Sequence, residues 1–274
     1  MIIAQISDTH IGSGDASVAP PDEASIRLQQ AVAHLLRLPA RPDLVLISGD
    51  CVNSGSVSEY QRFRSLIEPL TMPIYIIPGN HDDRVQLLEQ FGTQGSAPLA
   101  GFAQYVVDAG PLRLIGLDTN VPGKGEGFLC AERLGWLEQR LAEAPHRPTL
   151  IFMHHPPFAT GLMPFDTIGL INADMLGAVI ARHPQVERIV AGHVHSTMLR
   201  RFHGTLAITC PATYQQILPD LRQPERLLVS VEPPACLLHV WGEATGMITH
   251  TSLIGDHGPL VTLHDGINWV PQNG

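Results

Sequence analysis

The sequence predicts a layered α/β fold, and three observations support this prediction. Short apolar, β-branched runs alternate with longer segments of helical periodicity through most of the chain. The composition, with 44% hydrophobic and 16% charged residues, is typical of a globular protein and excludes a disordered, collagen-like or coiled-coil chain. The 274 residues suffice for one large α/β unit or two domains, and they can bury a core without a disulfide or a structural metal. Any metal ion that the protein binds is therefore available for chemistry.

The first half of the chain is expected to alternate strands and helices. Its apolar runs predict strands over residues 2–7, 43–48, 74–77, 105–107 and 112–117, and its helical patterns predict helices over 24–38, 57–69, 84–91 and 131–142. In the first of these helices Leu28, Ala31 and Leu35 recur at helical spacing. The strand over 74–77 stops at Pro78-Gly79, a pair typical of a turn.

The second half of the chain is expected to become rich in strands. A strand over 149–153, a helix over 173–182 and a strand over 188–191 continue the alternation, and strands then follow over 198–202, 206–209, 227–231, 235–240 and 247–251. This change divides the chain into a core over residues 1–200 and a β-rich C-terminal part over 201–274. We expect the C-terminal part to complete a second sheet and to supply a surface for homo-oligomerisation.

Charge and the short motifs exclude several classes of partner. The chain carries 17 Lys and Arg against 26 Asp and Glu, a net charge of −9, and no basic run offers a surface for extended nucleic acid. The apolar N-terminus is cut short by Asp8, and no apolar run approaches the length of a membrane span. The cysteines show no CxxC pairing, which is typical of reduced thiols. We therefore predict a cytoplasmic protein that does not bind membranes.

Short polar clusters follow directly after five of the predicted strands. They are Asp8-Thr9-His10, Gly49-Asp50, Gly79-Asn80-His81-Asp82, His154-His155-Pro156 and Gly192-His193-Val194-His195. Because loops at the ends of strands converge on ligands in α/β sheets, clusters at five strand ends predict one shared site. We also expect the glycines to adopt positive φ, where the chain must leave each strand sharply.

The side chains in these clusters favour a site for two metal ions. Carboxylate, imidazole and amide ligands without a thiolate suit divalent Mn, Fe, Zn or Co. A catalytic ion takes three or four protein ligands and keeps a position for water, so seven candidates fit two ions that share a bridging carboxylate, for which Asp50 is the natural choice. The spacing of two between Asp8 and His10, and between His193 and His195, lets each pair point to one side of an extended segment.

These motifs resemble the five-part signature of the calcineurin-like metallophosphoesterases over roughly residues 1 to 200. Within that superfamily, the motifs over 5–10, 48–53, 77–83 and 152–157 are similar to those of bacterial class III cyclic-nucleotide phosphodiesterases and related glycerophosphodiesterases. The resemblance implies a four-layer α/β/β/α sandwich with a dimetal site at the strand ends.

The resemblance also implies a role for each matched residue. One ion would be held by Asp8, His10, Asp50 and His195, and the other by Asp50, Asn80, His154 and His193. His81 matches the family's non-ligand histidine beside the substrate phosphoryl group, so His81, Asp50 and Asn80 are the expected catalytic residues. The phosphoprotein phosphatases of the superfamily continue the second motif with an arginine, whereas this chain has Asn53-Ser54-Gly55.

Simpler interpretations apply to several neighbouring residues. Of the adjacent histidines, His154 is the expected ligand, and His155 is expected to pack or to hydrogen-bond nearby. Cys51 is expected to be a buried structural thiol rather than a nucleophile. Asp82 is expected to cap the helix that starts near Arg84. An arginine from elsewhere, Arg84 or Arg113, remains a candidate to contact a phosphate.

The predicted activity is hydrolysis of a small phosphodiester by metal-activated hydroxide. A 3′,5′-cyclic nucleotide and a glycerophosphodiester are both open as the substrate. The alternatives are a general phosphomonoesterase, a nuclease of the same superfamily, and a non-catalytic scaffold with this fold. The complete ligand set argues against a scaffold, and the scarcity of basic residues argues against a nuclease.

Overall fold

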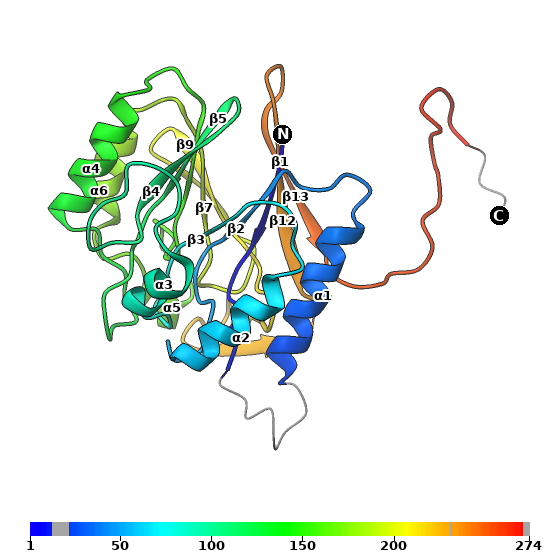
Figure 1. Cartoon of the computed structure of the whole chain (residues 1–274), viewed down its shortest axis with the longest axis horizontal. Helices are drawn as coiled ribbons and strands as arrows, with labels where there is room; N and C mark the ends of the chain where they lie inside the picture. The colour runs from blue at the N-terminus through cyan, green and yellow to red at the C-terminus, as the bar shows by residue number, and fades with distance from the viewer. Residues whose placement is uncertain (13–21, 231, 271–274) are drawn as a thin grey trace.

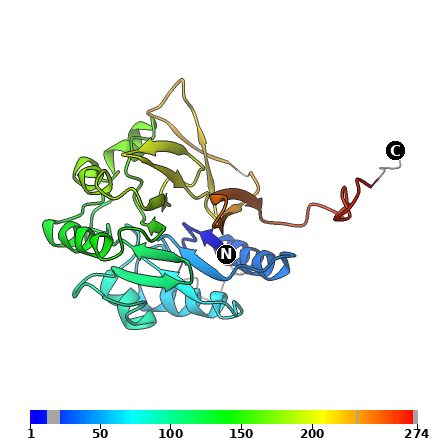
Figure 2. The same ribbon diagram turned by 90° about the horizontal axis from the view of Figure 1, so that it is seen from above.

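Two β-sheets pack face to face, and helices cover the outer face of each sheet (Figures 1 and 2). The structure is a computed structural model of the chain, and it describes residues 1–12, 22–230 and 232–270. The resulting order of layers, α/β/β/α, confirms the sandwich that the motifs implied. Within the described residues, none of the helices combines the length and the apolar character needed to cross a bilayer.

The first sheet has the strand order β13-β12-β1-β2-β3. Its parallel part consists of β1 (Ile2–Ile6), β2 (Leu44–Ile47) and β3 (Ile74–Ile76). The strand β12 (Ala235–Gly242) pairs antiparallel with β1, and β13 (Gly246–Leu253) pairs antiparallel with β12 at the edge of the sheet. The three parallel strands therefore end at the same edge of the sheet.

The second sheet has the strand order β4-β5-β6-β7-β9-β8. Its strands are β4 (Tyr105–Ala109), β5 (Leu112–Gly116), β6 (Thr149–Phe152), β7 (Val186–Ala191), β8 (Leu199–Phe202) and β9 (Thr205–Thr209). The run from β5 to β9 is parallel, and the outer strands β4 and β8 are antiparallel to their neighbours. A separate hairpin consists of β10 (Gln216–Pro219) and β11 (Leu227–Ser230).

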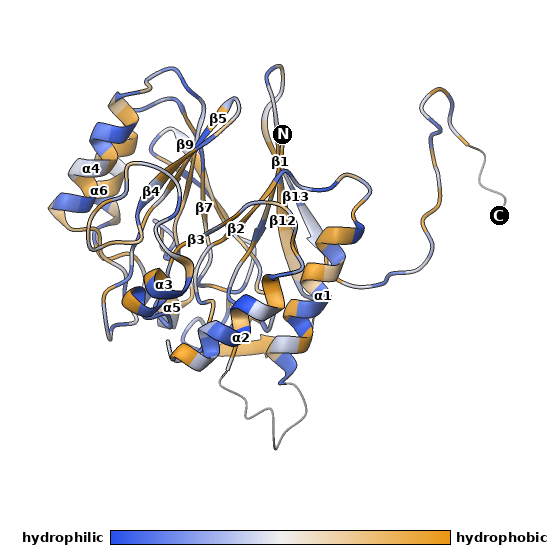
Figure 3. Cartoon of the chain, viewed as in Figure 1, coloured by the Kyte–Doolittle hydropathy of each residue, from blue (hydrophilic) through white to orange (hydrophobic). Residues whose placement is uncertain are grey.

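The helices bury their apolar faces against the sheets. The helices are α1 (Glu23–Arg37), α2 (Val57–Ile67), α3 (Arg84–Phe91), α4 (Ala131–Ala142), α5 (Met163–Thr167) and α6 (Ala173–Ile180). Side chains of α1 and α2 share one core with the outer face of the first sheet, and those of α4 and α6 share another with the second sheet and the space between the sheets. Figure 3 shows the apolar strands inside and the mixed polarity of the helices that cover them.

The predicted elements agree with the structure within a few residues. The helices over 84–91 and 131–142 match at both ends, and the strand predicted over 227–231 is described as far as Ser230, since Val231 lies outside the described residues. The short helix α5 and the strand β10 were not predicted, because α5 is too short to show helical periodicity and each of the two contains a proline, which is unfavourable in regular structure.

The expectation that the C-terminal part completes the second sheet is wrong for its last two strands. Only β8 and β9 join the second sheet, whereas β12 and β13 extend the first. Without β12 the apolar strand β1 would be an exposed edge, and β12 offers buried Ala235, Cys236 and Leu237 to cover it. The C-terminal part thus completes both sheets.

Candidate metal centre

The polar clusters meet where the parallel strands of both sheets end. The cluster with Asp8 and His10 follows β1, Asp50 follows β2, and Asn80 follows β3. From the second sheet, His154 follows β6, and His193 and His195 follow β7. Because the two sheets face each other, these side chains approach from opposite sides. The ligand atoms of Asp8, His10 and His195 all lie within 4.8 Å of one another. The same holds for the ligand atoms of Asp8, Asp50 and His154.

The first group of side chains directs two imidazole nitrogens and a carboxylate oxygen to one point. His10 Nε2 lies 3.1 Å from His195 Nε2, which in turn lies 3.5 Å from Asp8 Oδ1. His195 Nδ1 lies 2.8 Å from the carbonyl oxygen of Gln215, and since a carbonyl only accepts, Nδ1 carries the hydrogen. Nε2 is therefore the ring nitrogen that faces the point shared with His10 and Asp8, and a carbonyl oxygen holds the other ring nitrogen, as is common for a metal-binding histidine.

The second group repeats this arrangement on the other side of Asp50. His154 Nε2 lies 3.0 Å from Asn80 Oδ1 and 3.4 Å from Asp50 Oδ2. His154 Nδ1 donates to the carbonyl oxygen of Ser48 at 2.8 Å, which again leaves Nε2 as the ring nitrogen that faces the site. The same Asp50 Oδ2 lies 3.7 Å from His10 Nε2, so one carboxylate oxygen stands between the two groups.

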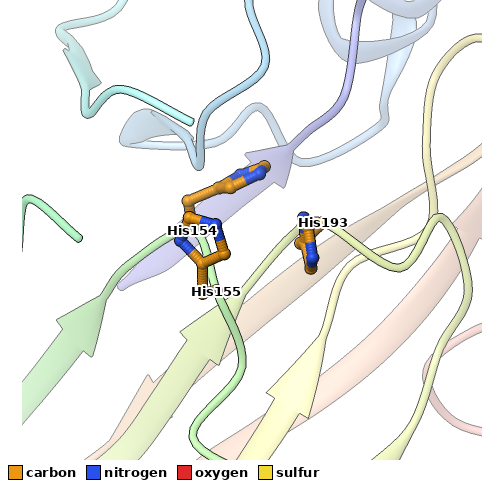
Figure 4. Close-up of side chains that lie close together, drawn as sticks. All are labelled: His154, His155 and His193. Atoms are coloured by element: carbon orange, nitrogen blue, oxygen red, sulfur yellow. The ribbon is translucent and has the colours of Figure 1, made fainter. Parts of the chain in front are cut away.

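His193 supplies an independent indication that the site fits a cation. The side chain is buried, and its Nε2 atom has no hydrogen-bond partner. Its ring packs against the ring of His154 with centroids 5.1 Å apart, and Figure 4 shows both side chains at the end of the sheet. A buried polar atom without a hydrogen-bond partner costs free energy unless a bound ligand, such as a metal ion, contacts it.

His155 lies beside these residues, but both of its ring nitrogens are occupied. Nδ1 lies 2.8 Å from the hydroxyl of Thr119, and Nε2 donates to the carbonyl oxygen of Gly125 at 2.9 Å. Burial, with the neighbouring His154, lowers the pKa of His155 to about 3, so the ring is neutral. His155 therefore fixes the loop over 119–125 beside the site, and it hydrogen-bonds nearby as the sequence analysis expected.

The electrostatics of the site favour a positive charge between the carboxylates. Burial alone would lower the pKa of His154, but Asp50 raises it to about 9. Burial alone would raise the pKa of Asp50, but His154 and His10 hold it well below its usual range. Burial lowers the pKa of His10 to about 4 and that of His193 well below its usual range. His10 and His193 are therefore neutral, whereas His154 carries a proton beside the ionised carboxylate of Asp50, and a divalent ion that binds there would take the place of this proton.

The backbone at the site is strained at the polar residues themselves. Asp8, His10, Asp50, His193 and His195 all have positive φ, between 45° and 74°. L-residues rarely adopt this conformation, and it is held where function over-determines the local structure. It turns each side chain sharply back toward the site at the end of its strand.

The glycines of the motifs meet two different requirements, which corrects the expectation of a shared positive φ. Gly49 does have a positive φ, of 95°. Gly79 and Gly192 do not, and instead permit close approach: a Cβ atom on Gly79 would lie 2.2 Å from Asp50 Oδ1, and one on Gly192 would lie 2.1 Å from Ser7 Oγ. A side chain at either position would displace a residue of the site.

The expected role of Asp82 is wrong, and the cap of α3 is its neighbour. Asp83 accepts a hydrogen bond from the Gln86 amide at the start of the helix. Asp82 is buried and accepts from the amides of Cys51 and Gly79, so it ties the loop after β3 to the loop after β2. Burial raises the pKa of the Cys51 thiol well above its usual range, which agrees with a structural cysteine.

His81 stands at the open side of the site. Its Nδ1 donates to the carbonyl oxygen of Asn53 at 2.9 Å, and its ring contacts that of His10 with centroids 4.7 Å apart. Nε2 is therefore the ring atom with which His81 can act on a substrate. A pocket of about 290 Å³ adjoins it and is lined by residues that include Ser54, Asn80 and Arg84.

Of the two candidate arginines, only Arg84 lies near the site. Its guanidinium is held by the buried carboxylate of Asp118 and by the carbonyl oxygen of Asn120 at 2.6 Å. Arg113 is on β5, and it contacts Arg140 and Glu143 away from the site. The guanidinium of Arg84 is thus already engaged within the protein by a carboxylate that also lies 3.9 Å from Arg133.

The sequence analysis missed two sets of residues that shape the site. Asp118-Thr119-Asn120 follows β5 directly, so the rule that found the five clusters would also have found it. Gln5 is a fully buried polar residue within the apolar strand β1, and its place in an otherwise apolar run was the available signal.

Comparisons with known proteins agree with this geometry. A family model described as Calcineurin-like phosphoesterase matches residues 1–197. The chain is 34% identical over 256 residues to the "Probable glycerophosphodiester phosphodiesterase GpdQ" of Arcobacter nitrofigilis, covering 93% of this chain and 94% of the relative. It is 32% identical over 219 residues to the 3′,5′-cyclic adenosine monophosphate phosphodiesterase CpdA of Pseudomonas aeruginosa, covering 80% and 78%.

Among solved structures, a dimetal phosphatase from Danio rerio is similar with a TM-score of 0.67 at 15% identity, covering 93% of this chain and 99% of that one, and this likeness supports the fold alone. The family model matches most of the chain, and the matched region carries all the motifs whose side chains meet at the strand ends. The chain therefore belongs to the calcineurin-like phosphoesterase family, whose members use a dimetal centre.

Proposed function

We propose that the protein hydrolyses small phosphodiesters at a centre of two divalent metal ions. The observation that carries the proposal is the position of Asp50 Oδ2, which lies 3.7 Å from His10 Nε2 on one side and 3.4 Å from His154 Nε2 on the other. One shared carboxylate between two groups of imidazoles suits a pair of ions. The absence of a thiolate among these side chains favours Mn, Fe, Zn or Co.

The proposed ligands divide into two sets that share Asp50. Asp8, His10, Asp50 and His195 would hold one ion, and Asp50, Asn80, His154 and His193 would hold the other. The first set is supported by the convergence of Asp8, His10 and His195, and the second by the unpartnered Nε2 of buried His193 and by Asn80 Oδ1 beside His154. When bound, the two ions would neutralise the phosphoryl oxygens and lower the pKa of the attacking water.

His81 would serve the reaction from outside the ligand sets. In the hydrolysis a water oxygen forms a bond to phosphorus, the bond to the leaving oxygen breaks, and a proton passes from water to the departing alkoxide. The Nδ1 atom of His81 is committed to Asn53, so Nε2 is the atom that would donate to a phosphoryl oxygen or protonate the alkoxide. Asp50 Oδ1 accepts from the main-chain amide of His81 at 2.9 Å and so couples His81 to the centre.

The charge around the site favours a diester over a monoester. A diester carries one negative charge, whereas a monoester dianion is best bound by further cationic donors. Asn53 and Ser54 stand where the phosphoprotein phosphatases have an arginine, and Arg84 is already paired with Asp118. Relatives named as glycerophosphodiester and cyclic-nucleotide phosphodiesterases support both substrate classes for this chain.

A substrate panel with controlled metal content tests the proposal. The metal-stripped protein should be inactive, and added Mn, Co or Zn should restore cleavage of bis(p-nitrophenyl) phosphate, because the proposed ligands can contribute to hydrolysis only with ions bound. Cyclic AMP and glycerophosphoethanolamine in the same panel decide between the two substrate classes. Full activity of the stripped protein, verified by elemental analysis, would overturn the metal-dependent mechanism.

We further propose that the protein forms a homo-oligomer through the hairpin of β10 and β11. The hairpin exposes Leu218, Leu221, Leu227 and Val229 to solvent. The apolar strand predicted over 235–240 is used within the chain, since β12 pairs with β1. Burying the exposed leucines and valine against a second copy would stabilise an assembly. Sedimentation should show a dimer or larger species at micromolar concentration, and a monomer there would contradict the proposal.

We also propose a cytoplasmic location. Cys51, Cys130, Cys210 and Cys236 are all free thiols, as is usual in a reducing compartment. Fractionation of the source cells, with the protein detected by antibody, should find it with cytoplasmic markers, and recovery with an oxidising compartment would contradict this location.

A further inference from the structure

Gln5 is a polar residue at a position where the packing predicts an apolar one. In β1 the side chains alternate, with Ala4 and Ile6 in the core beneath the outer helices and Ile3 in the core between the sheets. Gln5 lies on the same side as Ile3, pairs in register with Leu46 and is fully buried. An uncharged amide in such a place is costly unless all its hydrogen-bonding groups are used.

Both ends of the Gln5 side-chain amide form hydrogen bonds, and the partners lie directly after β2, on β7 and on β12. Nε2 donates to Ser48 Oγ at 2.8 Å and to the carbonyl oxygen of Ala191 at 3.0 Å. Oε1 accepts from His239 Nε2 at 3.1 Å. Because a carbonyl oxygen can only accept, the contact with Ala191 fixes which end of the amide is nitrogen. Gln5 therefore has one orientation.

Two of these partners immediately precede residues of the metal centre. Ser48 is followed by Gly49 and Asp50, and its carbonyl oxygen accepts the Nδ1 hydrogen of His154 at 2.8 Å. Ala191 ends β7 and is followed by Gly192 and His193. Gln5 thus links the end of β2, in one sheet, to the end of β7, in the other.

The two sheets approach each other closely at this point, so a cross-link there sets the geometry of the site. Ser48 Oγ donates to Ser7 Oγ at 2.8 Å, and Ser7 precedes Asp8. The amide of His193 donates to both carboxylate oxygens of Asp8 at 3.1 Å. The hydrogen bonds between His193 and Asp8 can form only if the ends of β1 and β7 keep this separation.

His239 supports Gln5 from the opposite side. Its Nδ1 lies 2.9 Å from the hydroxyl oxygen of Thr249. That oxygen accepts a hydrogen bond from Arg188 at 3.2 Å. Burial, with Arg188 nearby, lowers the pKa of His239 to about 3, so the ring is neutral and its single hydrogen is on Nε2, toward Gln5. The orientation of the Gln5 amide is therefore held by β12 and β13 as well.

We propose that Gln5 is a positioning residue that ties the end of β7 to the ends of β1 and β2 and thereby fixes the distance between the metal ligands contributed by the two sheets. The inference rests on the proposed dimetal centre. Gln5 touches no substrate or ligand itself and acts through Ser48 and Ala191. Residues that orient metal ligands in this way typically change metal affinity by about 10- to 100-fold when they are replaced.

Metal titration of the full chain carrying Gln5→Leu tests the proposal. Leucine keeps much of the volume and removes all three hydrogen bonds. Titration of the stripped protein with Co(II), followed by the visible spectrum and by elemental analysis, should show the affinity for at least one ion reduced about tenfold or more. Hydrolysis of bis(p-nitrophenyl) phosphate should lose kcat at saturating metal, with a smaller change in KM, because the ligands are misplaced while the substrate pocket remains.

A matched control separates positioning from general stability. Gln185 is also a buried glutamine, and its Nε2 donates to the carbonyl oxygen of Leu141 at 3.0 Å, but it lies before the start of β7, at the end of the strand away from the site. Gln185→Leu should lower the thermal midpoint and leave both Co(II) affinities within about twofold of wild type. If Gln5→Leu behaves in the same way, the proposal is overturned.

A milder variant keeps the test informative if Gln5→Leu does not fold. Ser48→Ala removes one of the two acceptors of Gln5 Nε2 and should reduce Co(II) affinity in the same direction by a smaller factor. Wild-type affinity in Ser48→Ala would contradict the proposal. A wild-type protein that binds no Co(II) would instead contradict the dimetal centre itself, so failure of the two proposals can be distinguished.

Discussion

Asp50 is the residue on which the two halves of the proposed centre depend. Its Oδ2 faces His10 and His154, and its Oδ1 accepts from the amide of His81. Asp50→Ala should therefore remove metal from both positions, and activity should fall by more than about a hundredfold. Elemental analysis of the purified variant, compared with wild type, measures the loss of each equivalent.

Asn80→Ala is the matched comparison for Asp50→Ala. A neutral amide oxygen is a weaker ligand than a shared carboxylate, and Asn80 approaches only the group that contains His154. We expect this variant to keep about one equivalent of metal under conditions in which wild type keeps two. Equal losses in the two variants would contradict the assignment of Asp50 as the bridge.

The lowered pKa of buried His239 predicts that the free energy of unfolding depends on pH. Its folded pKa of about 3 lies below the value of about 6.5 for an unfolded histidine, so the unfolded state binds more protons between these values. Stability from this group is complete above about pH 6.5 and is lost as the pH falls toward 3, by up to about 1.4 kcal/mol per pH unit. His239→Gln should reduce the slope of the free energy of unfolding against pH, measured with urea between pH 7 and 5.

The exposed residue His250, on the neighbouring strand β13, is the control for His239. His250→Gln should leave the slope unchanged, because a solvated side chain has no burial penalty to lose. A wild-type slope in His239→Gln would contradict the account of a neutral buried ring.

At the scale of elements, helices with strong periodicity and short strands with apolar, β-branched runs were predictable, whereas α5 and β10 were not. The helix α4 buries Leu134, Leu137 and Leu141 along one face, and this spacing is visible in the sequence. The sheet that receives a strand is decided by packing between distant segments, and so the place of β12 beside β1 was not predictable from its own residues. The same holds for Gln5, whose partners are Ser48, Ala191 and His239.

The helix α2 begins with a capping box that also shapes the loop beside His81. Ser56 Oγ accepts from the Glu59 amide, and the Glu59 carboxylate accepts from the amides of Ser56 and Ser54. Ser56→Ala should lower the free energy of unfolding by about 1 kcal/mol, measured with urea. Ser65→Ala, at an exposed position near the end of the same helix, should change it by less than half as much; equal losses would contradict the capping role.

At the scale of the whole molecule, the metal centre is a product of the sandwich rather than of any one segment. The sequence shows which residues follow the strands, and the family resemblance assigned them to two sets. The sequence does not show that Asp8 would accept a hydrogen bond from the amide of His193 in the other sheet. Nor does it show that five of the proposed ligands would adopt positive φ. Both features arise when two sheets end at the same edge, so they depend on packing between residues about 185 positions apart.

The selectivity between a diester and a monoester tests the central claim most directly. The measurement compares kcat/KM for bis(p-nitrophenyl) phosphate and p-nitrophenyl phosphate with the Mn-loaded protein at one pH. Because Arg84, which lines the pocket beside His81, is held by the carboxylate of Asp118, the diester should be favoured by at least about tenfold, or about 1.4 kcal/mol in transition-state stabilisation. Equal efficiency for the two substrates would contradict the assignment as a diesterase and indicate a general phosphatase.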